Sequence, residues 1–170
     1  GRIIRANVPD SQVGTTFSCS PIEPVNDKHR HDKTTKRFDA LVNRLYIEPP
    51  QGLGYPIDDL PLLQKMEKYI MDGDMKRVEF DFDFYGLQNY SRMITKANAI
   101  VPFMAGTPVH PKKLKPKPGI TEMGWEVHPE GLYKMLKYFD KYEKIDKVIV
   151  TENGSAFPDV VENGRIHDDE

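Results

Sequence analysis

The chain has 170 residues, 38% of them hydrophobic and 29% charged, which is enough apolar material for one ordinary core. Its formal net charge of -2 argues against a nucleic acid or an anionic membrane as the partner, because both attract strongly basic surfaces. Cys19 is the single cysteine, and neither a signal segment nor a long apolar span appears, which favours a reducing, cytoplasmic location. Because the chain opens without Met and stops at Glu170 with no closing element, we expect residues 1–170 to be an internal part of one domain, truncated at both ends.

The first half of the chain predicts a helix, a strand and a second helix. Residues 1–8 are expected to end a helix before Pro9, because a proline pushes the residue before it out of helical geometry. Residues 12–18 are rich in β-formers and predict a strand, and the prolines and asparagine of residues 21–26 predict a loop after it. From Asp32, a candidate N-cap, apolar residues recur at three-and-four spacing to about residue 46 and predict an amphipathic helix.

The second half continues the alternation. Residues 59–73 have the spacing of a helix, and residues 80–90 alternate and predict a strand. Residues 99–121 contain five prolines and four lysines without periodicity, which predicts a long, solvated loop. Residues 129–142 predict a helix with an apolar stripe, and the β-branched run of residues 147–151 is typical of a strand buried on both faces.

This order of elements favours an α/β fold in which βαβ units form a parallel sheet. Reactive groups in such folds collect where strands end, and three predicted strands end in polar residues, at positions 18–20, 88–90 and 152–153. Glu152 directly follows four β-formers, so a rigid strand would hold its carboxylate at the edge of the sheet. Taken alone, it is either a catalytic carboxylate or a solvated, capping glutamate.

Several motifs together resemble the retaining β-glycosidases of glycoside hydrolase family one. Residues 150–154, Val-Thr-Glu-Asn-Gly, resemble the nucleophile motif of that family. Four further segments resemble its other motifs in the family's order: residues 13–18, 54–56, 83–90 and 121–132. The resemblance implies a partial (β/α)8 barrel with about three parallel strands and intervening helices, running from the end of the fourth helix to just past the seventh strand.

The resemblance also implies roles for four residues. Glu152 would be the nucleophile that forms a covalent glycosyl-enzyme, and the hydroxyl of Tyr90 would bond and orient it while keeping the carboxylate ionised. Gln88 stands where the family often has Asn and would have a polar role near the reacting centre. Trp125 would form an aromatic wall for the sugar or its leaving group, although a core position is the commoner place for a lone tryptophan. No cofactor or metal is implied.

The acid/base residue of the family lies in an Asn-Glu-Pro motif, which this chain does not contain. Glu23 and Glu48 each precede a proline, but both lie in the wrong place in the order of elements, so we reject them. We therefore expect the segment alone to be inactive on the β-linked glycoside substrate of the parent enzyme. Two alternatives are a non-catalytic sugar-binding remnant and a complementing half of a split barrel, whose partner would be the remaining parts of the barrel.

Two other features have ordinary interpretations. His29, His31 and Asp32 could be metal ligands, but a polar loop that leads into a helix is the favoured interpretation. Cys19 is expected to be a small buried side chain near a strand end.

Overall fold

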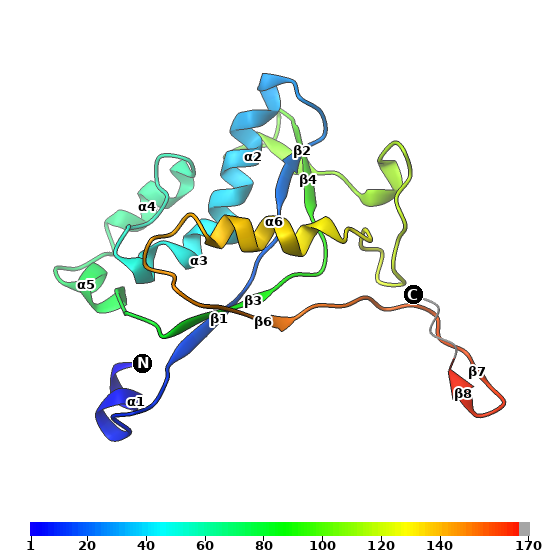
Figure 1. Cartoon of the computed structure of the whole chain (residues 1–170). Coiled ribbons are helices and arrows are strands. Elements are labelled where there is room, and N and C mark those ends of the chain that lie inside the picture. Colours follow the sequence, from blue (N-terminus) through cyan, green and yellow to red (C-terminus); the bar gives the residue numbers. More distant parts are fainter. Residues whose placement is uncertain (167–170) are drawn as a thin grey trace.

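The computed structural model of the chain describes residues 1–166 and contains a central sheet of three parallel strands (Figure 1). These strands are β1 (Gly14–Ser18), β3 (Phe84–Gln88) and β6 (Val148–Glu152), in the order β1-β3-β6. Both neighbouring pairs are parallel. The predicted parallel α/β arrangement is confirmed.

The helices lie mainly on one side of this sheet, and Figure 1 shows α2, α3 and α6 above it. The predicted helix from residue 32 to 46 is confirmed as a continuous run that includes one π-helical stretch, Ala40–Arg44. No helix within residues 1–166 has the length and apolar character needed to cross a membrane. The helices are α1 (Arg2–Asn7), α2 (Asp32–Asp39), α3 (Leu45–Ile47), α4 (Gln64–Glu67), α5 (Asp74–Val78) and α6 (Glu130–Phe139), with 3-10 turns at His29–His31, Pro49–Gln51, Pro61–Leu63 and Pro111–Lys113.

A second three-stranded sheet lies beyond the carboxyl ends of β1 and β3. It consists of β2 (Ile22–Pro24), β4 (Met93–Ala97) and β5 (Gly106–Pro108), in the order β2-β4-β5. The prediction that residues 21–26 and 99–121 are only loops was therefore wrong. Proline lacks the N–H that a central strand needs, but Pro24 and Pro108 lie on the two edge strands, where its absence is tolerated. A small hairpin, β7 (Val161–Glu162) and β8 (Arg165–Ile166), follows the central sheet.

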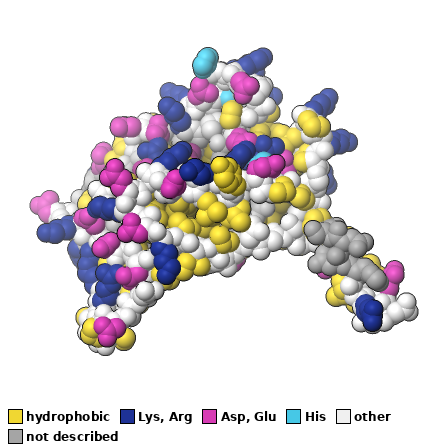
Figure 2. All heavy atoms as spheres, viewed as in Figure 1, with side chains coloured by type: hydrophobic (Ala, Val, Ile, Leu, Met, Phe, Trp, Pro, Cys, Tyr) yellow, Lys and Arg dark blue, Asp and Glu magenta, His cyan; other side chains and the backbone are white. Residues whose placement is uncertain are grey.

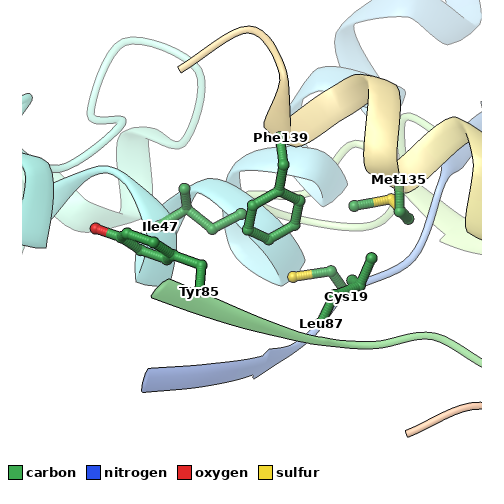
Figure 3. Close-up of a cluster of buried hydrophobic side chains, with 6 residues drawn as sticks. All are labelled: Cys19, Ile47, Tyr85, Leu87, Met135 and Phe139. Atoms are coloured by element: carbon green, nitrogen blue, oxygen red, sulfur yellow. The ribbon is translucent and has the colours of Figure 1, made fainter. Parts of the chain in front are cut away.

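The core lies between the central sheet and the helices (Figure 3). Met135 and Phe139 of α6 pack there against Tyr85 and Leu87 of β3, and all four are buried. The apolar stripe predicted for residues 129–142 is therefore present. Cys19 is buried in the same cluster, as predicted, and its burial raises the pKa of the thiol to about 12, so it is a packing residue rather than a reactive thiolate.

The prediction that residues 147–151 form a strand buried on both faces was wrong. β6 lies at an edge of the sheet, and no described helix covers the face opposite to α6 (Figure 1). Its apolar side chains are consequently half exposed, with Ile149 at 37% of its maximum. The β-branched run identified the strand but could not identify its neighbours.

The helix predicted over residues 59–73 is interrupted. Only a 3-10 turn and the four residues of α4 form there, and α5 begins after Gly73, which has a positive φ of 85°. Leu60 and Leu63 are buried in a second cluster with Ala40, whereas Met66 is exposed. The apolar residues of this segment do not share one face, so packing does not support a single long helix.

Two further boundaries differ from the prediction. The strand expected over residues 80–90 begins only at Phe84. The residues before it contact the first segment of the chain instead. Phe80 lies under the guanidinium of Arg5 at 4.8 Å, and Asp83 accepts hydrogen bonds from Arg5 and from the backbone N–H of Val13. Asp32 is the first residue of α2 rather than its N-cap, and its carboxylate contacts His29 Nδ1 at 3.1 Å.

Candidate functional site

The three polar strand ends identified in the sequence meet at one edge of the central sheet. The backbone N–H of Cys19 donates to the carbonyl of Gln88 at 2.9 Å, and the N–H of Asn89 donates to the carbonyl of Glu152 at 3.1 Å. The amide of Asn153 donates to the carbonyl of Asn89 at 2.6 Å. The carboxyl ends of β1, β3 and β6 are therefore held together by hydrogen bonds of the main chain and of the Asn153 side chain.

A β-bulge determines the direction of the Glu152 side chain. Leu87 of β3 pairs with Val150, but the next residue, Gln88, pairs with Glu152, so that one additional residue, Thr151, lies in β6. Without it, strict alternation would place Glu152 on the face that α6 covers, with Val150. The bulge instead turns the carboxylate to the face opposite to α6, where Gln88 lies. Bulges next to active sites often redirect a side chain in this way.

Both carboxylate oxygens of Glu152 accept a hydrogen bond. Gln88 Nε2 donates to Oε1 at 2.7 Å, and the hydroxyl of Tyr90 donates to Oε2. The bond to this carboxylate raises the pKa of Tyr90, so the phenol keeps the proton that it donates. Two of the residues singled out in the sequence thus fix the orientation of the third.

Trp125 lies beside this group. Its ring centroid is 5.4 Å from that of Tyr90, with the planes tilted by 46°, within the range of favourable aromatic pairs. The indole is 37% exposed, so Trp125 is not a core residue. A tight turn holds it: its N–H donates to Thr121 Oγ1, its carbonyl accepts from the N–H of Thr121, and Gly124 has a φ of 79°.

Before the strand ends, the face of the sheet that carries Glu152 is lined by small residues. Gly86 lies between Thr16 and Thr151, whose hydroxyls are 2.8 Å apart. A Cβ at Gly86 would come within 2.6 Å of Thr16 Oγ1 and 3.0 Å of Thr151 Cγ2. Only glycine fits there without displacing Thr16, whose hydroxyl is hydrogen bonded to that of Thr151, the bulged residue before Glu152.

Sequence reasoning missed the structural role of Asn89. It is buried, and its amide donates to the carbonyls of Cys19 and Ser91 at 2.8 and 3.2 Å. The first residues of α6 approach it so closely that a Cβ at Gly131 would lie 3.0 Å from Asn89 Oδ1. Residues 88–90 were identified as a polar strand end. Because all three are polar, the sequence pattern does not indicate that Asn89 faces the core.

A cluster of charged residues near Trp125 was also missed. Arg92 donates from Nε and Nη2 to the two oxygens of Glu126 at 2.8 Å each, and from Nη1 to Glu23 at 2.6 Å. Lys134 of α6 also donates to Glu23. The bonds to Glu126 and Glu23 raise the pKa of Arg92. Burial acts to raise the pKa of Glu23, but the bonds from Lys134 and Arg92 outweigh it and lower that pKa. These residues are far apart in sequence, so no local pattern signals them.

The remaining candidates of the sequence have structural partners. Glu48, which was rejected as an acid/base, accepts a hydrogen bond from Arg44 Nε at 2.6 Å. His31 is buried, and its Nδ1 accepts the backbone N–H of Ala97 at 2.9 Å. Within residues 1–166 no group of three or more His, Cys, Asp or Glu side chains is placed to hold a metal ion.

Comparison with known proteins identifies relatives from a single family. The sequence model of Glycosyl hydrolase family 1 matches residues 2–170. Beta-glucosidase A of Thermotoga maritima is 31% identical over 169 residues, which cover 98% of the chain and 36% of that protein. The structure of the AHE enzyme from Alicyclobacillus herbarius superposes with a TM-score of 0.86 at 28% identity, covering 98% of this chain and 37% of that one.

A third relative is a beta-glucosidase from Thermotoga maritima solved in complex with glucoimidazole, which superposes with a TM-score of 0.80 at 31% identity and covers 99% of this chain and 37% of that one. The chain therefore spans well under half of the length of the relatives that it matches.

Proposed function

The chain belongs to glycosyl hydrolase family 1 and forms part of a (β/α)8 barrel, and we propose that Glu152 is the nucleophile with which the parent protein hydrolyses β-linked glycosides. The observation that carries this proposal is the pair of hydrogen bonds to the Glu152 carboxylate, one from Gln88 and one from Tyr90. They hold the carboxylate in one orientation at the carboxyl end of β6, and active sites of such barrels lie at the carboxyl ends of the strands.

In the proposed reaction, a Glu152 oxygen attacks the anomeric carbon while the bond from that carbon to the leaving-group oxygen breaks. The leaving group takes its proton from a second carboxyl group. In the second step that group, now a carboxylate, takes a proton from water, and the water oxygen attacks the anomeric carbon and releases the carboxylate of Glu152. Gln88 and Tyr90 hold the attacking carboxylate, and Trp125 forms a wall of the sugar or leaving-group site. Such positioning matters because small displacements of reacting groups are costly.

The proposal is tested in the protein that contains this chain, by hydrolysis of an aryl β-glucoside. We expect Glu152→Gly to abolish turnover, and azide to restore it by occupying the space of the lost carboxylate and attacking the same carbon. Tyr90→Phe is expected to lower kcat by roughly tenfold or more, since one bond to the nucleophile is lost. Unchanged turnover by Glu152→Gly would refute the assignment.

The 170-residue chain by itself is proposed to be inactive. Retaining hydrolysis needs a second carboxyl group about 5 to 5.5 Å from the nucleophile, and the Asn-Glu-Pro motif expected to supply it does not occur in this sequence. Assay of the purified chain with the aryl β-glucoside should give no turnover above buffer. Turnover that disappears in Glu152→Gln would contradict this expectation.

A second candidate is a sugar-binding segment without catalysis, and the contact between Tyr90 and Trp125 favours it. A partly exposed pair of aromatic rings is a surface on which a sugar ring can stack. Both candidates predict no turnover by the 170-residue chain alone, so calorimetric titration with cellobiose separates them by binding: binding that is lost in Trp125→Ala is expected for the second candidate, and no binding for an inactive part of a hydrolase.

A further inference from the structure

The ion pair of Arg92 and Glu126 has no part in the chemistry proposed above, yet it is one of the most buried charge contacts of the chain. Glu126 is only 4% exposed. Two parallel N–H···O bonds join it to Arg92, and such a fork fixes the relative orientation of the two side chains as well as their distance. Buried ion pairs contribute little net stability, because desolvation offsets much of the attraction. Their more specific effect is on geometry.

The pair joins the two backbone segments that carry the aromatic residues of the candidate site. Glu126 directly follows Trp125, and Arg92 comes two residues after Tyr90. The bonds between Thr121 and Trp125 close the turn that presents the indole, and the N–H of Glu122 donates to the carbonyl of Ala156 at 2.8 Å, but none of these bonds reaches the segment of Tyr90. A link between these segments therefore determines how the indole lies against the phenol.

The link is itself anchored. Arg92 bonds Glu23 of β2, and Glu23 accepts from Lys134 of α6. A displacement of Arg92 is thus resisted by a strand of the second sheet and by the helix that covers the core. Trp125, Arg92 and Glu126 also line a cavity of about 570 Å³, together with apolar residues that include Met123 and Leu114.

We propose that Arg92 and Glu126 are positioning residues, which fix Trp125 against Tyr90 and so set the shape of the wall that a glycoside leaving group meets. The leaving-group part of this inference rests on the proposed function, whereas the positioning of the indole does not. The variants that test it are Arg92→Lys, which keeps the charge but not the two parallel bonds, and Glu126→Gln, which keeps the shape but not the charge.

Trp125 is the only tryptophan of the chain, so its fluorescence reports this position alone. The experiment measures acrylamide quenching and the emission maximum of the 170-residue chain, without any sugar. We expect both variants to raise the quenching constant roughly twofold and to shift the emission to longer wavelength, because the indole leaves Tyr90 and becomes solvated.

Arg44→Lys is the matched control. Arg44 also bonds two carboxylates, Glu48 and Asp59, and its side chain is 25% exposed against 24% for Arg92. This cluster adjoins the other end of α6, where Tyr142 lies 3.4 Å from Glu48. The control should leave the quenching constant as in the wild type, because its bonds do not involve the Trp125 turn.

Three results would overturn the proposal. The first is wild-type quenching in both Arg92→Lys and Glu126→Gln. The second is an equal rise in Arg44→Lys, which would indicate general loosening. The third is loss of the far-ultraviolet circular dichroism in both test variants but not in the control, which would make the pair a structural one. Because no glycoside is present, none of these results depends on whether the chain serves a hydrolase.

Discussion

At the scale of single residues, the protonation of His31 is coupled to folding. Its Nδ1 accepts the N–H of Ala97 at 2.9 Å, which requires an unprotonated Nδ1, and the Nε of Arg30 lies 3.4 Å from its Nε2. Burial lowers the pKa of His31 below its ordinary value of 6.5, and the charges of Arg30, Lys28 and Lys96 act in the same direction. Protonation would cost both the hydrogen bond and the burial of a charge.

This coupling predicts that stability falls with acidity. Between the lowered folded pKa and the unfolded value of 6.5, the unfolded chain binds more protons than the folded one, so the free energy of unfolding decreases as the pH falls through this window. Urea denaturation at about pH 8 and about pH 5 measures the decrease. His128, whose pKa burial also lowers, adds to it.

The decrease should become smaller in His31→Gln, whose amide oxygen can still accept from Ala97 but does not titrate. His29→Gln is the control, because His29 is the neighbouring but fully exposed histidine. If His31→Gln kept the full pH dependence of the wild type, the coupling assigned to His31 would be wrong.

At the scale of elements, the sequence predicted those parts that depend on local patterns. The strands β1, β3 and β6, the helix from residue 32 and the helix α6 follow from β-formers and three-and-four spacing. The same patterns place residues 88, 90 and 152 at strand ends, whereas their proposed roles come from the family resemblance. The second sheet did not, because β2 and β5 have only three residues each and both contain a proline, so pairing with β4 rather than propensity stabilises them.

The direction of the Glu152 side chain is the clearest limit of sequence reasoning. Alternation along residues 148–152 would give the wrong face, and only the pairing of Gln88 with Glu152 instead of Thr151 corrects it. A bulge depends on two strands that are about sixty residues apart, so it has no local signal. The same holds for the contact of Arg92 with Glu126.

The packing of α6 gives a prediction at this scale. Phe139 is fully buried against Tyr85 and Met135, so Phe139→Ala should lower the free energy of unfolding by about 3 to 5 kcal/mol, from lost burial and the resulting cavity. Tyr133→Ala on the same helix is the control. Its side chain is 67% exposed, and removing it should change stability by less than about 0.5 kcal/mol.

Urea denaturation of the three proteins measures both effects. A loss for Phe139→Ala no greater than that for Tyr133→Ala would show that α6 does not close the core in solution.

At the scale of the whole molecule, the central sheet is open. Within residues 1–166, β1 and β6 each pair on one side only, and the helices α2, α3 and α6 cover one face of the sheet (Figure 1). The space-filling view shows hydrophobic side chains in the middle of the molecule, between the α1 side and the β7–β8 hairpin (Figure 2). A free strand edge beside exposed apolar side chains is a template for pairing with another chain.

This openness predicts that the 170-residue chain self-associates through β6 as its concentration rises, or pairs with other parts of a barrel when they are supplied. Ile149 lies in the middle of β6, opposite Gly86 in the register and on the open face. Ile149→Lys should therefore reduce the association, because a charged edge strand resists pairing. Sedimentation velocity over a series of concentrations gives the weight-average mass.

Ile100→Lys is the matched control for this change of charge. Ile100 is 90% exposed but lies in the turn between β4 and β5, outside the central sheet. If association is driven by net apolar exposure, both substitutions reduce it alike. If the edge of β6 is the template, as the geometry indicates, only Ile149→Lys does, because it alone adds a charge to the strand along which a second strand would have to pair.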